Sequence, residues 1–239
     1  MPGTMFDVPA VTLGILGPQL GVNLRLMPLQ LPTEELSPEE QKSAGERIWK
    51  PLYQQNLIVN GSLRPDLEQA LRTLAKPELA VVLVFGDDGA EAPSLAVRAG
   101  ADPRNAVVAS QRGDVVRFRL CPTSQLVATV MSLVPDCAPL KDFRPVTVPR
   151  GDAELTDEDQ KRDREEVQRI EALPVLRTGF AQTIGRDAAV EIIGWNDTSE
   201  GRYVVYGQEH SEQFWDIYQA ADNQQVGGVI ANAIATVMG

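Results

Sequence analysis

The pattern of apolar and polar residues is easiest to interpret between residues 189 and 208. A mainly apolar run at 190–193 and a second run at 203–206 flank a polar cluster at 196–201. β-Branched and aromatic residues on both sides of turn-forming residues favour an antiparallel hairpin. The length of the cluster predicts a turn of more than two residues. Gly201 lacks a Cβ, so we expect it to adopt a positive φ in this turn.

Short apolar runs separated by turn residues continue on both sides of this hairpin and predict two blocks of strands. The run at 79–85 is continuously apolar, which is typical of a buried strand. Gly, Asp and Pro between the runs indicate the turns of an antiparallel meander. The predicted strands span residues 79–85, 95–98, 106–110 and 115–120 in the first block and 175–183, 190–195, 203–207 and 214–218 in the second.

Helical periodicity is clearest at the C-terminus, where Asp222 or Asn223 is expected to cap the last helix. One face of that helix is apolar and is formed by Val226, Val229, Ile230, Ala233, Ile234 and Val237. The proline-rich stretch at 144–155 predicts a linker or an extended arm. Further helices are predicted at 8–20, at 37–55, at 64–74, after Thr123 or Ser124, and at 156–171.

The two strand blocks end alike, because an amphipathic helix follows each of them. The matching apolar positions are Leu126, Val130 and Val134 in the first helix and Val226, Ile230 and Ile234 in the second. This similarity predicts two halves, about 1–145 and about 146–239, related by a pseudo-twofold axis. Strands and helices are segregated and do not alternate as βαβ units, so we predict an α+β fold in which each half is an antiparallel β-meander flanked by helices. The halves are expected to form one globular unit, a single domain over 1–239.

The charge balance narrows the class of partner. The chain has 22 basic and 33 acidic residues, a net charge of −11. Such a surface repels phosphate backbones and anionic membranes, which argues against nucleic-acid binding. No run approaches the roughly 20 apolar residues of a membrane-spanning helix, and the N-terminus lacks the basic region of a signal peptide. We therefore expect no membrane insertion and a cytoplasmic location.

Residues that could perform chemistry are sparse. His210 is the single histidine, and Cys121 and Cys137 fit no metal-ligand spacing, so we interpret the cysteines as thiols in a reducing cytosol. No nucleophile elbow, zinc-protease helix, phosphate-binding loop or dinucleotide fingerprint occurs. The sequence predicts no metal, no cofactor and no enzymatic activity.

Three segments of the sequence resemble those of a known family: LIVNGSLRPDL at 57–67, LRTLAKP at 71–77 and GWNDTSEGRY at 194–203. The first resembles the entry into the second helix of the EspG family, the cytosolic chaperones of actinobacterial type VII (ESX) secretion systems. The second is similar to that family's helix-ending proline before the first long strand. The third is similar to its aspartate–threonine–x–x–glycine–arginine hairpin near the C-terminus.

The resemblance implies a non-enzymatic chaperone. Such a protein binds the apolar helical tip of a PPE protein within a PE–PPE heterodimer, keeps it soluble and directs it to a type VII secretion system. The family binds that tip with loops of the strand block and with the C-terminal helical region, here the loop at 100–105 and the last helix. The partner-binding residues that the resemblance implies are Asp102, Arg104, Asn105, Asn223, Gln224 and Asn232.

Two other classes of protein remain open. The many acidic residues could supply a hydrolase that uses carboxylates in a cleft, which would require strongly shifted pKa values. The chain could also be a structural or regulatory module that self-associates through its sheets or helices. The chaperone hypothesis expects a monomer or a weak homodimer.

Overall fold

The computed structural model describes residues 4–32, 49–151, 158–186, 191–210 and 213–238. Its contacts divide the chain into two compact units. The first unit comprises Met1–Val82 and Leu95–Val130, and the second comprises Leu83–Ser94 and Met131–Gly239. The prediction of a single domain whose halves meet near residue 145, and that of a pseudo-twofold axis, stay predictions.

The first unit is built on an antiparallel sheet with the strand order β1-β7-β6-β5-β4. Its elements are β1 (Met5–Pro9), α1 (Ala10–Leu20), a short helix at 49–54, β2 (Ile58–Val59), β3 (Ser62–Leu63), α3 (Pro65–Ala75), the first part of β4 (Leu79–Asp87), β5 (Leu95–Ala101), β6 (Asn105–Arg112), β7 (Val115–Pro122), the 3₁₀ turn η1 (Thr123–Gln125) and α4 (Leu126–Met131).

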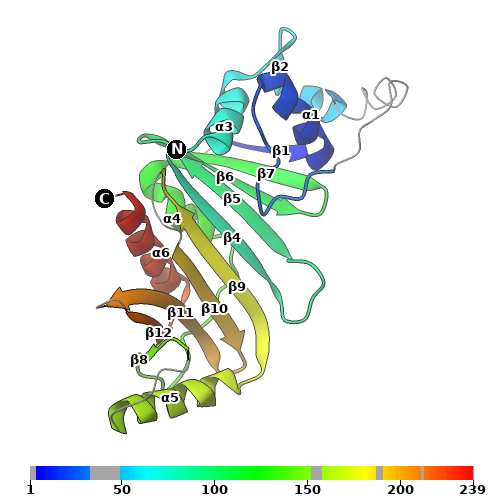
Figure 1. The fold of residues 1–239 in the computed structure, drawn as a ribbon. Helices are drawn as coiled ribbons and strands as arrows, with labels where there is room; N and C mark the ends of the chain where they lie inside the picture. Colours follow the sequence, from blue (N-terminus) through cyan, green and yellow to red (C-terminus); the bar gives the residue numbers. More distant parts are fainter. Residues whose placement is uncertain (1–3, 33–48, 152–157, 187–190, 211–212, 239) are drawn as a thin grey trace. The chain divides into compact units, whose positions relative to one another are not determined.

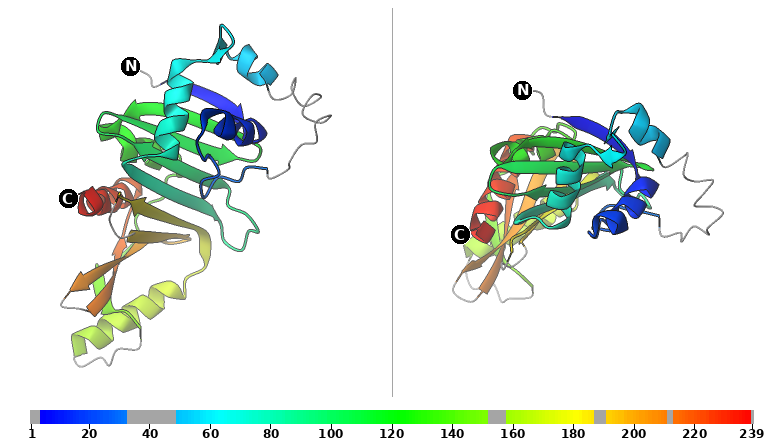
Figure 2. Two further views of the ribbon diagram at one scale, coloured as in Figure 1. Left: turned by 45° about the horizontal axis from the view of Figure 1, so that its top comes forward. Right: turned by 90° about the horizontal axis from the view of Figure 1, so that it is seen from above.

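Helices α1 and α3 lie on one face of these strands (Figures 1 and 2). The periodic apolar residues of α3 are all buried, as the spacing predicts: Leu67, Ala70, Leu71 and Leu74. They share a hydrophobic core with Leu13 and Leu16 of α1 and with Phe118 of β7. Burial of these side chains fixes the two helices on the sheet.

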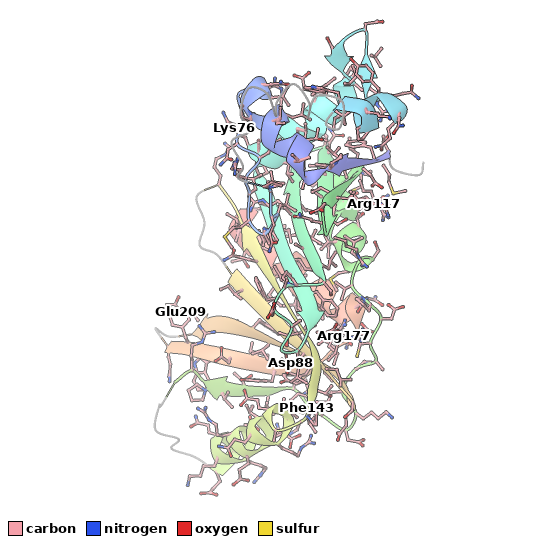
Figure 3. The ribbon with its side chains drawn as sticks, turned by 90° about the vertical axis from the view of Figure 1, so that its right-hand side faces the viewer. Lys76, Asp88, Arg117, Phe143, Arg177 and Glu209 are labelled. Carbon is pink, nitrogen blue, oxygen red and sulfur yellow. The ribbon has the colours of Figure 1, made fainter. Side chains whose placement is uncertain are left out.

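The second unit is a second run of antiparallel strands, β9-β10-β11-β12-β8, with the last part of β4 beside β9. The N–H of Asp88, just after β4, donates to the carbonyl oxygen of Leu176 at 3.0 Å, and Figure 3 shows Asp88 near Arg177. The elements after residue 131 are β8 (Val146–Pro149), α5 (Glu158–Glu171), β9 (Val175–Ile184), β10 (Glu191–Thr198), β11 (Gly201–His210), β12 (Gln213–Ala220) and α6 (Asn223–Met238).

Helix α5 covers one end of this sheet. Val167 and Ile170 of α5 share a core with Tyr203 and Tyr218, whose rings stack with centroids 6.4 Å apart. Helix α6 packs against β9 and β10. The mixed architecture of antiparallel strands and segregated helices confirms the predicted α+β class.

The structure corrects several sequence-based boundaries. The helix predicted from residue 8 begins at Ala10, because Met5–Pro9 pairs with β7 as a strand. The predicted linker contains β8, which pairs with β12. The hairpin turn is only Ser199 and Glu200, since Thr198 pairs with Gly201. Most of the helix predicted at 37–55 lies outside the described residues, which resume at 49.

Candidate partner-binding site

The six predicted partner-binding residues lie in two places, each within one unit. The turn patch is formed by Asp102 and Arg104, in the connection between β5 and β6, and by Asn105, the first residue of β6. The helix patch, Asn223, Gln224 and Asn232, belongs to α6.

Asp102 shapes the turn patch. Its Oδ1 accepts hydrogen bonds from the backbone N–H groups of Arg104 and Asn105, both at 2.8 Å. These hydrogen bonds lower the pKa of the Asp102 carboxyl, because they favour its ionised form. The Asp102 carbonyl accepts a further bond from Thr123 Oγ1 at 2.8 Å. Arg104 and Asn105 are the exposed members of the patch.

A pocket of about 490 Å³ adjoins the turn patch. It lies where α3 meets the start of β6 and the end of β7. Arg104 and Asn105 both line it. The other lining residues are Thr4, Gln69, Ala70, Thr73, Ala106, Val107, Leu120, Cys121, Pro122 and Gln125.

The start of α6 is capped as predicted. Asp222 Oδ1 accepts the backbone N–H of Gln225 at 2.8 Å, and Gln225 Oε1 accepts the backbone N–H of Asp222 at 2.8 Å. This reciprocal arrangement is a capping box, which satisfies donors that a helix start leaves unpaired. It fixes the first turn of α6, which carries two residues of the helix patch, Asn223 and Gln224.

Asn223 bonds within its own unit. Its Nδ2 donates to the carbonyl oxygen of Val134 at 2.9 Å and to Asp136 Oδ1 at 3.2 Å. Its Oδ1 accepts a hydrogen bond from Arg202. Asn223 therefore holds the 134–136 segment against α6, whereas Gln224 and Asn232 are exposed.

A second pocket, of about 470 Å³, adjoins the helix patch. It is lined by Asp136, Cys137, Ala138, Asp222, Asn223 and Gln224. Burial raises the pKa of the Cys137 thiol, with the nearby Asp197 carboxylate acting in the same direction. Each predicted patch thus borders a hollow that contains one of the two cysteines, Cys121 or Cys137.

The outer face of α6 carries no charge. None of the 16 residues from Asn223 to Met238 is Asp, Glu, Lys or Arg, although 23% of the whole chain is charged. The exposed side chains are amides, small residues, one threonine and one methionine: Gln224, Gln225, Gly228, Ala231, Asn232, Ala235, Thr236 and Met238. Placing this face against another protein would desolvate no ionised group.

The hairpin segment at 194–203 has a structural role. Thr198 Oγ1 donates to the carbonyl oxygen of Gly201 at 2.8 Å and accepts the N–H of Glu200 at 3.2 Å. Gly201 has a φ of 130°, and a Cβ there would lie 2.5 Å from the carbonyl oxygen of Pro139. Arg202 is fully buried and ion-paired with Asp197. The sequence predicts the turn and the glycine but not the burial of Arg202. Asp197 lies only five residues away across the hairpin, whereas the other partners of Arg202, Pro135 and Asn223, are distant in sequence.

Metal-binding clusters and membrane-spanning helices are both absent from the part of the chain that the structure describes. No cluster of three or more His, Cys, Asp or Glu side chains there could hold a metal ion. Nor does any helix there have the length and apolar character required to cross a membrane.

The profile of the EspG family matches residues 9–232, most of the chain. The chain belongs to the EspG family. One solved structure that resembles it is the Mycobacterium tuberculosis type VII secretion system chaperone EspG5 in complex with the PE25–PPE41 dimer. The TM-score is 0.66 at 15% sequence identity, and the match covers 98% of this chain and 96% of the other. This likeness shows that the two proteins share a fold. No curated protein matches the chain.

Proposed function

We propose that this EspG-family chain is a cytoplasmic chaperone for a PE–PPE heterodimer. It binds the apolar helical tip of the PPE protein, keeps the pair soluble and directs it to a type VII secretion system. Membership of the family supports this function, as does the fold shared with EspG5, a chaperone described in complex with a PE–PPE dimer.

The observation that carries the proposal is the uncharged outer face of α6 in a chain of net charge −11. Charged residues are depleted in the buried centres of protein interfaces, because removing them from water is costly. Small side chains such as Gly228, Ala231 and Ala235 allow the backbone of a partner helix to approach closely. The amides of Gln224 and Asn232 supply the polar rim that an apolar tip requires.

The hydrolase alternative needs a general acid, and three carboxyl groups with shifted pKa values do not supply it. The pKa values of Asp7, Asp102 and Glu166 are all lowered, in each case mainly by hydrogen bonds to the ionised form. A general acid at neutral pH needs a raised pKa. These three carboxyls remain ionised at neutral pH and lack that property.

Co-expression tests the proposal. The chain is produced with a PE–PPE pair, and the mass of the purified species is measured by size exclusion with light scattering. We expect a heterotrimer for the native chain and loss of the complex for Ala231→Arg on the outer face of α6. Gln168→Arg is the matched control, since Gln168 is an exposed, uncharged residue of α5. Elution of the native chain alone, beside a soluble PE–PPE pair, would contradict the proposal.

A further inference from the structure

The pocket beside the turn patch has an unusual lining for so acidic a chain. Of its twelve described lining residues, Arg104 alone is charged, and none is acidic. The chain as a whole has 33 acidic and 22 basic residues. The pocket is therefore a local exception to the negative surface, and it lies wholly within the first unit.

The interior of the pocket is apolar and its edge is polar. Ala70 and Val107 are each 1% exposed and form part of its wall, together with Leu120. Gln69 and Gln125 are exposed and provide uncharged hydrogen-bonding groups. A volume of about 490 Å³ is within the range of pockets that enclose small organic groups. These dimensions suit one or two apolar side chains.

The backbone of Arg104 is fixed, and its positive charge helps to lower the pKa of Asp102 without a salt bridge between the two side chains. The Asp102 carboxylate holds the Arg104 N–H, and the Arg104 carbonyl accepts the N–H of Thr123 at 3.4 Å. Asp102 directs its own oxygen to two backbone N–H groups. No described carboxylate forms a salt bridge with Arg104. A guanidinium fork recognises a carboxylate through two parallel hydrogen bonds.

We infer that this pocket is a socket for an apolar side chain of the partner that lies next to a carboxylate, with Arg104 as the counterion of that carboxylate. The inference rests on the proposed function, since the occupant is a segment of the PE–PPE pair. Charge complementarity selects this occupant: a basic segment would meet Arg104 and find no acidic group in the lining.

The charge of Arg104 is tested by affinity measurements with a purified PE–PPE pair. Arg104→Glu should weaken binding at least tenfold, and Arg104→Gln less, because only the first substitution repels the carboxylate. Arg112→Glu is the matched control, since it makes the same charge change at the other, exposed end of β6. Its affinity should stay within twofold of the native value, which separates local pairing from net charge.

The native thiol of Cys121 tests occupancy of the socket independently. In a Cys137→Ser background, the bound pair should slow alkylation of Cys121 by N-ethylmaleimide at least tenfold. Prior alkylation should weaken binding, and this effect should vanish in the variant that also carries Cys121→Ser. If the pair binds but neither Arg104→Glu nor the Cys121 adduct weakens its binding, the pocket does not hold a side chain of the partner. If the native chain does not bind the pair, the proposed function itself fails.

Discussion

Arg202 and Asp197 face each other across β10 and β11 as a buried salt bridge, with side chains 0% and 1% exposed. Arg202 Nη2 lies 3.1 Å from Asp197 Oδ2, to which Arg177 Nη2 also binds at 3.0 Å. The guanidinium further donates to the carbonyl oxygen of Pro135 and to Asn223 Oδ1. One buried side chain therefore connects the hairpin, the segment after residue 134 and the start of α6.

Replacing Arg202 should unfold or greatly weaken the protein. Arg202→Met removes a buried charge whose partners remain, which costs about 3 kcal/mol or more of unfolding free energy. Arg177→Met is the comparison, because Arg177 binds the same carboxylate but is 30% exposed. It should cost at most about 1 kcal/mol. Urea denaturation measures both values, and equal losses would show that burial does not set the contribution of Arg202.

Gly201 and Gly228 should respond to alanine in opposite directions. At Gly201 a Cβ would meet the carbonyl oxygen of Pro139 at 2.5 Å, and the φ of 130° is unfavourable for alanine. We expect Gly201→Ala to cost about 2 kcal/mol or more. At Gly228, in α6, a Cβ meets nothing within 4 Å, so Gly228→Ala should stabilise by about 0.5–1 kcal/mol. Thermal denaturation distinguishes the two signs.

Gly201→Val also tests the role assigned to the hairpin. Its main effect should be on stability, because the contacts of Gly201 are internal. Normal thermal stability combined with lost partner binding would show that the hairpin belongs to the binding surface.

Local patterns predicted most of the regular structure. The run at 79–85, the period of α3 and the apolar face of α6 each correspond to an observed element. In these cases the residues that determine an element are neighbours in sequence, so periodicity alone identifies it.

The two strands that the sequence did not predict depend on distant partners. β1 and β8 are short, and each is fixed by a neighbouring strand far away in the chain. Asp197 and Thr198 were interpreted as turn residues because they are polar. They are buried strand residues instead. Their hydrogen-bond partners, Arg202 and Gly201, are near in sequence, but it is the pairing of β10 with β11 that places them opposite. Of the six predicted site residues, Asn223 has its amide in internal hydrogen bonds that no local pattern indicates.

Gln55 protects the edge of the first sheet. Its Oε1 accepts the N–H of Asp7 at 3.0 Å, and its Nε2 donates to the Asp7 carbonyl at 2.7 Å, so one amide imitates a neighbouring strand. We expect Gln55→Ala to accelerate hydrogen exchange at the Asp7 amide and to promote self-association through the open edge. Gln54→Ala, at the adjacent exposed residue, is the control. Unchanged exchange at Asp7 would contradict the protective role.

The Asp7–Arg117 pair predicts a pH dependence. Hydrogen bonds from Arg117, at 2.8 Å, lower the pKa of Asp7 below its ordinary value. A lowered pKa in the folded state gives stability that is present above the unfolded pKa of about 3.9 and is lost as the pH falls through the folded pKa. NMR titration should find the Asp7 pKa raised towards its ordinary value in Arg117→Gln, and Arg112→Gln should leave it unchanged. An equal Asp7 pKa in all three proteins would contradict this assignment.

The proposed function requires this chain to bind a PE–PPE heterodimer through the outer face of α6. Isothermal titration of the purified chain into a purified PE–PPE pair tests it most directly. We predict saturation at one chain per heterodimer with a Kd of about 10 μM or tighter, and a loss of binding for Ala231→Arg that Gln168→Arg does not share. Absence of saturable binding by the native chain, or equal affinity for both variants, would contradict the claim.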